Sequence, residues 1–284
     1  MSRTSPLVNV MQQAVRKASR RLVRDFGEVE NLQASLKGPE DFVKAADVRT
    51  DEKLRDTLQQ ARPSFGFLSK EGRGTVGEDK TRCWIIDPIG GATNFTHGIP
   101  MFCISVALEE AGEVTAGVVY APILDEMFWA ERGQGAFLND RRLRVASRRH
   151  LSDAVIGTGI PHLGRPDNPG YLAGLAAVMA ECGGIRGMGP AALELAYVAA
   201  GRFDGFWETG LAPWDIAAGI LLAREAGAMV SCTNGATKPV YAGDVLAANE
   251  AIHSRMLRLI RQSRQPRSLS GCLRLLRCRY RHHR

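Results

Sequence analysis

Long apolar runs are missing from this sequence of 284 residues. A membrane-spanning helix needs about 20 consecutive apolar residues, and no stretch approaches that length, which excludes an integral membrane protein of the helical type. The N-terminal segment also lacks the apolar core and the small-residue cleavage site of a secretory signal peptide. Six scattered cysteines without an export signal favour reduced thiols. We therefore expect a cytoplasmic protein that has no membrane attachment.

Lysine and acidic residues are absent from residues 251–284, which carry ten arginines. The whole chain has a net charge of +7, with 37 basic and 30 acidic side chains, so residues 1–250 keep 27 basic against 30 acidic ones. The basicity belongs to the C-terminal end, and nucleic-acid binding is expected only through it. We expect residues 266–284 to form a disordered arginine-rich tail. An amphipathic anion-binding segment that includes Leu257, Leu259 and Ile260, or an out-of-frame coding end, remain alternatives.

Internal repeats and low-complexity linkers are also absent, so the expected helices and strands are inferred from the spacing of apolar residues along the chain. Apolar residues recur at helical spacing over 7–23, and Asp47 is expected to open a second helix that runs through Leu58. Short apolar runs between residues 63 and 145 predict an antiparallel or mixed sheet. From residue 151 onward, strands alternate with helices, as in an α/β layer.

These patterns predict an α/β protein with one domain over residues 1–265. Its two closely packed lobes are expected at about residues 1–150 and 151–265. With 45% hydrophobic and 24% charged residues, the chain can bury an ordinary globular core, which excludes an intrinsically disordered protein.

The segment WIIDPIGGATNF, residues 84–95, combines a strand, a carboxylate and a glycine turn. An apolar run leads into Asp87, breaks at Pro88, and passes two glycines before a predicted helix start. Backbone amides from Gly91 through Thr93 are expected to point at an anion there. An aspartate before proline is also a common turn former.

A second segment, PWDIAAGILLAREAG, places Asp215 in the first turn of an apolar helix. A carboxylate in this position stabilises a helix through the helix dipole alone. Glu208 lies seven residues earlier in the sequence.

With FLSKEG and GPAALELAYVAAGRFDGFWE, these segments resemble the inositol monophosphatase family, the magnesium-dependent sugar and polyol phosphatases. The resemblance covers nearly all of residues 7–262. It implies a layered αβαβα sandwich, a homodimer, and Mg²⁺ ions that bind the substrate phosphate and activate a water for attack on phosphorus. The metal ligands that it implies are Asp87, the Ile89 carbonyl and Asp215. The substrate-binding residues that it implies are Gly91, Ala92, Thr93 and Glu208, with Asp47 as a supporting catalytic residue.

Four positions depart from the family pattern. The family loop reads Asp-Pro-(Ile or Leu)-Asp-Gly-Thr, whereas this chain has Gly90 for the second aspartate and Ala92 for the threonine that orients water. Lys70 replaces the first glutamate of the family's Gly-Glu-Glu, and Pro190 replaces a serine or threonine near the substrate. Proline also suits a helix start for structural reasons alone.

The departures change the charge of the expected metal site. Two carboxylates and one ammonium give a formal charge of −1 where the family pattern would gather −4. Magnesium requires oxygen ligands, so we expect at most one weakly bound Mg²⁺, and Lys70 paired with Asp87 or Asp215. Glu71, shifted by one place, and Thr93 are the alternatives for the lost ligand and hydroxyl.

The resemblance therefore implies a Mg²⁺-dependent phosphomonoesterase acting on inositol phosphate or a similar polyol phosphate. The substitutions predict low or absent activity, since losing a general base costs about 10²–10⁴ in rate. The alternative is a pseudoenzyme: an inactive family member that binds a phosphorylated ligand, a partner protein or RNA. Phosphate release from inositol 1-phosphate distinguishes the two.

Overall fold

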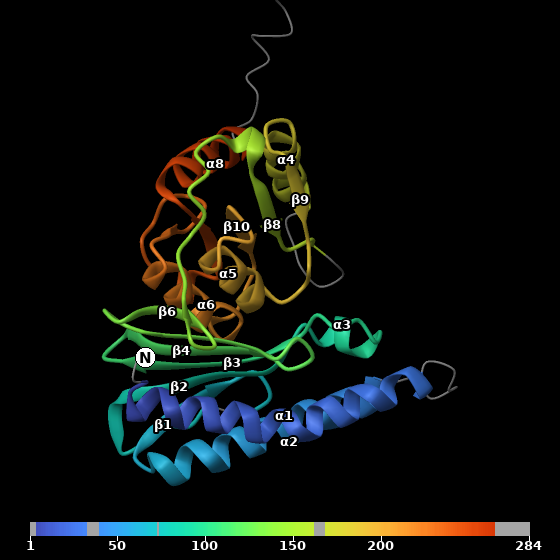
Figure 1. The fold of residues 1–284 in the computed structure, drawn as a ribbon, viewed down its shortest axis with the longest axis vertical. Helices are drawn as coiled ribbons and strands as arrows, with labels where there is room; N and C mark the ends of the chain where they lie inside the picture. The colour runs from blue at the N-terminus through green and yellow to red at the C-terminus, as the bar shows by residue number, and fades with distance from the viewer. Residues whose placement is uncertain (1–3, 33–39, 73, 162–167, 265–284) are drawn as a thin grey trace, which may run out of the picture.

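The computed structural model describes residues 4–32, 40–72, 74–161 and 168–264, and these form alternating layers of helix and sheet. The layers follow one another as helix, sheet, helix, sheet, helix (Figure 1). The αβαβα sandwich predicted from the sequence is confirmed. The predicted tail, residues 266–284, lies outside the described residues.

The first outer layer consists of α1 (Pro6–Leu32) and α2 (Glu40–Ala61). Both helices cover one face of the first sheet (Figure 1). The first helix extends past the predicted end at Val23. The prediction that Asp47 opens the second helix is wrong, because Glu40 and Asp41 supply the acidic first turn. Asp47 is instead a buried residue in the middle of α2.

The first sheet has seven strands in sequential order. Its first two strands are parallel and the remaining neighbours are antiparallel. The strands are β1 (Phe65–Ser69), β2 (Asp79–Gly90), β3 (Cys103–Glu110), β4 (Glu113–Ala121), β5 (Glu126–Glu131), β6 (Gly135–Leu138) and β7 (Arg141–Arg142). A short helix, α3 (Ala92–Thr96), follows β2 directly.

The second sheet is smaller and mixed, with the order β11-β12-β10-β8-β9. Its strands are β8 (Val155–Thr158), β9 (Gly184–Arg186), β10 (Gly205–Thr209), β11 (Met229–Ser231) and β12 (Asp244–Ala248). The remaining helices are α4 (Asn168–Met179), α5 (Ala191–Ala199), α6 (Pro213–Glu225), α7 (Pro239–Ala242), α8 (Glu250–Arg264) and the 3₁₀ turn Leu151–Asp153.

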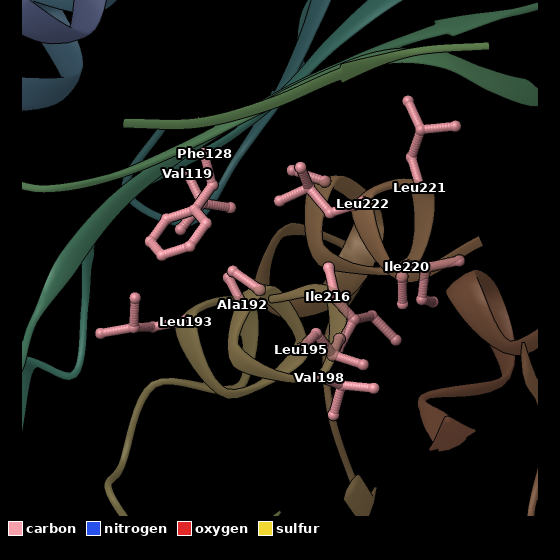
Figure 2. Close-up of a cluster of buried hydrophobic side chains, with 14 of the residues drawn as sticks. Val119, Phe128, Ala192, Leu193, Leu195, Val198, Ile216, Ile220, Leu221 and Leu222 are labelled. Carbon is pink, nitrogen blue, oxygen red and sulfur yellow. The ribbon is translucent and has the colours of Figure 1, made fainter. Parts of the chain in front are cut away.

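The central helices α5 and α6 lie between the two sheets, and this position explains their apolar sequence. Every residue of α5 is buried, as expected for a helix that is covered on all sides. Figure 2 shows how Val119 and Phe128 of the first sheet face side chains of α5 and α6. The labelled helix residues are Ala192, Leu193, Leu195, Val198, Ile216, Ile220, Leu221 and Leu222.

The last layer pairs α4 with α8 against the second sheet. Leu259 and Ile260 of α8 are buried in that apolar cluster, and Leu257 packs against it. These three residues therefore belong to the folded layer rather than to an arginine-rich tail. None of the described helices is both long and apolar enough to cross a membrane.

Candidate active site

A cavity of about 450 Å³ opens where the carboxyl end of β2, α3, and the starts of α5 and α6 meet. It joins segments that are far apart in the sequence. The predicted site residues that line it are Asp87, Gly90, Gly91, Ala92, Thr93, Pro190, Glu208 and Asp215. The remaining predicted residues, Asp47, Lys70 and Ile89, form a cluster that adjoins the cavity through Asp87.

The loop between β2 and α3 forms one wall of the cavity. Asp87 is 3% exposed, and the register of β2 against β3 shifts between Asp87 and Gly90. Gly91 has a φ of 87°, a left-handed conformation that favours glycine. A Cβ there would lie 3.0 Å from the Met101 carbonyl and 3.3 Å from Pro190 Cγ. Pro190 therefore closes on the loop that the sequence predicts to bind an anion.

Asp215 lies at the first turn of α6. Its Oδ2 accepts a hydrogen bond of 2.8 Å from the backbone N–H of Ala212. This bond satisfies one of the amides that a helix start leaves unpaired and fixes the direction of the carboxylate. Because Asp215 also lines the cavity, its helix-capping contact and a site role are compatible.

Glu208 enters the cavity from β10 and is 4% exposed. A Cβ on Gly159 would lie 1.9 Å from Glu208 Cδ, so the glycine leaves the space that this side chain fills. Thr158, in the same wall, donates its hydroxyl to the Trp207 carbonyl at 3.0 Å.

Lys70 has the densest contacts of the adjoining cluster. Its Nζ donates to Asp47 Oδ2 at 2.8 Å and to the Ile89 carbonyl at 3.2 Å, and lies 3.8 Å from Asp87 Oδ1. The sequence predicted a pairing with Asp87 or Asp215. The contact with Asp87 is present at 3.8 Å, but the shortest contact is with Asp47, because α2 brings that residue to the end of β1.

Burial and charge shift the pKa values in this cluster. Burial raises the pKa of Asp87 to about 8; the Lys70 ammonium opposes that rise, while the Asp215 and Asp47 carboxylates add to it. Burial also raises the pKa of Asp47, again against Lys70, and Glu71 adds to the rise. Burial lowers the pKa of Lys70, but Asp87, Asp47 and Glu71 together raise it more. Lys70 therefore remains charged at neutral pH.

A pair of magnesium ions does not fit this arrangement. The ammonium of Lys70 already takes the Ile89 carbonyl and lies beside Asp87, two of the oxygens that the family resemblance assigns to metal. Over the described ranges of the chain, no three His, Cys, Asp or Glu side chains come together as a metal-binding group. The described residues thus offer a cation of their own where the family would place a metal.

Two polar residues near the cavity were missed at the sequence level. Glu194 is 1% exposed, and its Oε1 accepts the N–H groups of Met188 and Gly189 at 2.6 and 3.0 Å. Burial raises its pKa to about 8, against the hydrogen bonds from Met188 and Gly189. A lone acid among the apolar residues of α5 was the signal available, since buried carboxylates require partners.

Asn94 of α3 connects two backbone segments that are far apart in the sequence. Its Nδ2 donates to the Met101 carbonyl and to the Met188 carbonyl, each at 2.7 Å. In the sequence, Asn94 follows the glycine loop without any distinguishing pattern. No local feature predicts its hydrogen bond to Met188, which is 94 positions away.

The comparisons with known proteins agree with this fold. A sequence model described as the inositol monophosphatase family matches residues 3–265. A protein of Rhizobium meliloti (strain 1021) named inositol-1-monophosphatase is 57% identical over 258 residues, 91% of this chain and 97% of that protein. A protein of Escherichia coli (strain K12) named Nus factor SuhB is 38% identical over 252 residues, 89% of this chain and 94% of that protein. The crystal structure of the extragenic suppressor protein suhB from Bartonella henselae superposes with a TM-score of 0.83 at 52% identity, covering 90% and 98% of the two chains.

Proposed function

The chain belongs to the inositol monophosphatase family, and from that premise we propose that it keeps a cavity for a phosphorylated polyol but hydrolyses phosphate esters slowly or not at all. One observation carries the proposal: the Lys70 ammonium lies 2.8 Å from Asp47 and 3.2 Å from the Ile89 carbonyl. In this family, magnesium supplies the activation of water and the neutralisation of phosphate charge. Paired metals contribute to both halves of such a displacement.

Some residues of this chain keep the substrate-binding role that the family assigns to them, whereas the metal-binding role is reduced. Glu208 and the backbone of Gly91, Ala92 and Thr93 remain in the cavity wall and support binding of the polyol and its phosphate. Any Mg²⁺ must compete with Lys70 for Asp87 and the Ile89 carbonyl, so at most one ion would bind, with Asp215 as its other ligand, and too weakly to stabilise the fold while Lys70 is charged. The Oδ2 atom of Asp47 accepts a hydrogen bond from Lys70, so this oxygen is not free to assist a water.

Phosphate release from inositol 1-phosphate, measured while Mg²⁺ is raised to high millimolar concentration, tests the proposal. We expect turnover far below the ~10 s⁻¹ of an ordinary enzyme. The Asp87→Asn variant, prepared in the same way, sets the background from contaminating phosphatases. Turnover near ~10 s⁻¹ that disappears in this variant would show that Glu71, Thr93 or another group replaces the missing parts.

A second function, from a different class, has support in the relatives named Nus factor SuhB, which are 37–38% identical over about nine-tenths of this chain. In this alternative the protein acts without catalysis, in the cytoplasm, as a homodimer that binds a partner or RNA. Fluorescence anisotropy with a labelled RNA tests it. Binding that persists in the Asp87→Asn variant and that weakens steeply with salt supports this alternative, and no binding at low salt excludes its RNA form.

A further inference from the structure

The cluster around Lys70 resembles a coordination shell in its choice of atoms. Two carboxylates and one backbone carbonyl surround the Nζ atom, and they come from α2 and from the carboxyl end of β2. Oxygen atoms of these kinds are the ligands that Mg²⁺ and Ca²⁺ take in proteins. A lysine ammonium carries three hydrogens and no acceptor. Two of the three hydrogens are donated, one to Asp47 and one to the Ile89 carbonyl. The Asp87 carboxylate makes a longer charge contact with Nζ at 3.8 Å.

The backbone that carries Lys70 is fixed on both sides. The Lys70 N–H donates to the Ile86 carbonyl at 3.3 Å. The buried Ser69 hydroxyl donates to Asp51, whose other oxygen accepts from Arg55 Nε at 2.6 Å. These hydrogen bonds fix the backbone of residues 69 and 70, so the Lys70 side chain extends from a defined position to its three oxygens.

The charges of the cluster need a cation. The side chains of Asp47 and Asp87 are only 6% and 4% exposed, so water screens a charge on either carboxylate poorly. Lys70, with 27% of its side chain exposed, supplies the positive charge. A divalent ion that entered beside it would face the ammonium at close range, and one that replaced it would leave the ammonium without these partners.

We propose that Lys70 is an internal cation that takes the structural place of a divalent metal, so that this cluster is held together without metal. Divalent ions then stabilise the folded chain only after the charge of Lys70 has been removed. The inference rests on the proposed function in one respect, since it concerns the same site, but its test measures stability and ion binding rather than catalysis.

The test compares the full chain with the Lys70→Glu and Lys70→Gln variants and with Lys53→Gln, an exposed lysine on α2 that serves as the matched control. Melting temperatures are recorded in EDTA and in a rising series of Mg²⁺. The parent and the control should melt at the same temperature in both conditions. Lys70→Glu should melt lower in EDTA and regain roughly 5–10 °C with Mg²⁺, the rise expected when an ion is present at about 100 times its Kd.

A parent chain that gains as much from Mg²⁺ as Lys70→Glu would overturn the inference, because the metal would then bind beside the lysine. Should the Lys70 variants fail to fold, Tb³⁺ luminescence on the parent decides the question. Saturable binding of Tb³⁺ that Asp87→Asn removes contradicts the inference, and its absence supports it. Magnesium-dependent turnover by a parent whose melting temperature ignores EDTA would overturn the proposed function and leave the role of Lys70 intact.

Discussion

Gly90 occupies a space at the end of β2 that has little room for a larger side chain. A Cβ at this position would lie 2.9 Å from Asp87 Oδ2 and 3.1 Å from the sulfur of Cys103. Cys103 is fully buried and belongs to the apolar core behind the cavity. An aspartate at position 90 therefore meets a carboxylate on one side and a sulfur on the other.

We predict that Gly90→Asp alone lowers the free energy of unfolding by about 1–3 kcal/mol, the usual cost of overpacking. Adding Cys103→Ala should recover part of that loss. Urea denaturation of both single variants and the double variant measures the coupling, which we expect at about 0.5–3 kcal/mol. Simple additivity of the two single effects would contradict the contact.

The same crowding alters how the catalytic site could be rebuilt. Lys70→Glu, Gly90→Asp and Ala92→Thr together restore the family residues, and their effects on turnover should be synergistic because such groups act as a unit. Cys103→Ala is expected as a necessary fourth change, because the sulfur of Cys103 lies 3.1 Å from where the Cβ of an aspartate at position 90 would lie. Mg²⁺-dependent phosphate release should rise more in the fourfold variant than in the triple, and equal rates would show that the sulfur does not obstruct the new ligand.

Between elements, Glu194 and Asn94 fix the segment that precedes α5. Glu194 holds the amides of Met188 and Gly189, while Asn94 of α3 holds the Met188 carbonyl. Residues 188 and 189, beside the cavity, are thus bonded both to α5 and to α3.

This arrangement predicts a pH dependence of stability. Burial raises the pKa of Glu194 from 4.5 to about 8, so its protonated form is favoured in the folded chain. The contribution to stability is complete below pH 4.5 and is lost as the pH rises toward 8. Glu194→Gln keeps an acceptor for both amides and removes the titration. The melting temperature of the parent should therefore fall relative to this variant between these two pH values.

Glu225→Gln is the matched control, because Glu225 also accepts two backbone amides, from Gly133 and Gly135, at a half-buried position. A difference between the parent and Glu194→Gln that stays constant with pH would show that Glu194 does not titrate in this range.

The elements show where sequence patterns succeed and where they fail. Short apolar runs placed the strands of the first sheet, since each run is long enough for one strand and ends at a turn residue. The start of α2 was misplaced because Asp47 has the chemistry of a helix start, although its function in the fold is a buried contact with Lys70. The two residues are 23 positions apart, and no local pattern reveals that separation.

The last helix, α8, ends at Arg264, inside the predicted domain of residues 1–265, although its sequence left an amphipathic alternative open. Leu259 and Ile260 alternate with arginines, which is also the pattern of an amphipathic tail, and only their burial against the second sheet assigns them to the core. We predict that Ile260→Ala lowers the free energy of unfolding by about 2–5 kcal/mol. The exposed neighbour Arg261→Ala should change it by less than about 0.5 kcal/mol. Urea denaturation of both variants tests the difference, and equal effects would place α8 outside the cooperative core.

In the molecule as a whole, the first sheet carries an apolar cluster on each face, one beneath α1 and α2 and the other beneath α5 and α6. The described layers are therefore stabilised by apolar packing on both faces of this sheet. Family membership and the layered fold were predictable because their motifs are local. The cation cluster was predictable only in part, because its geometry depends on how α2 meets β1.

We predict that deleting residues 266–284 leaves the melting temperature within a few degrees of the parent. The deletion removes six arginines and takes the net charge from +7 to +1. Any affinity for nucleic acid should be lost with it, and the parent should show a steep salt dependence. A truncated chain that unfolds, or that binds RNA as well as the parent, would contradict the prediction.

The contact between Gly90 and Cys103 also constrains how this sequence can change over generations. A change to aspartate at position 90 meets the sulfur before the site gains a working set of ligands. The opposite order begins with Cys103→Ala, which opens a void in the buried core and offers no benefit by itself. Both first steps lower stability, so selection opposes each of them. Neither change is favourable alone, so an aspartate ligand at position 90 requires both substitutions together.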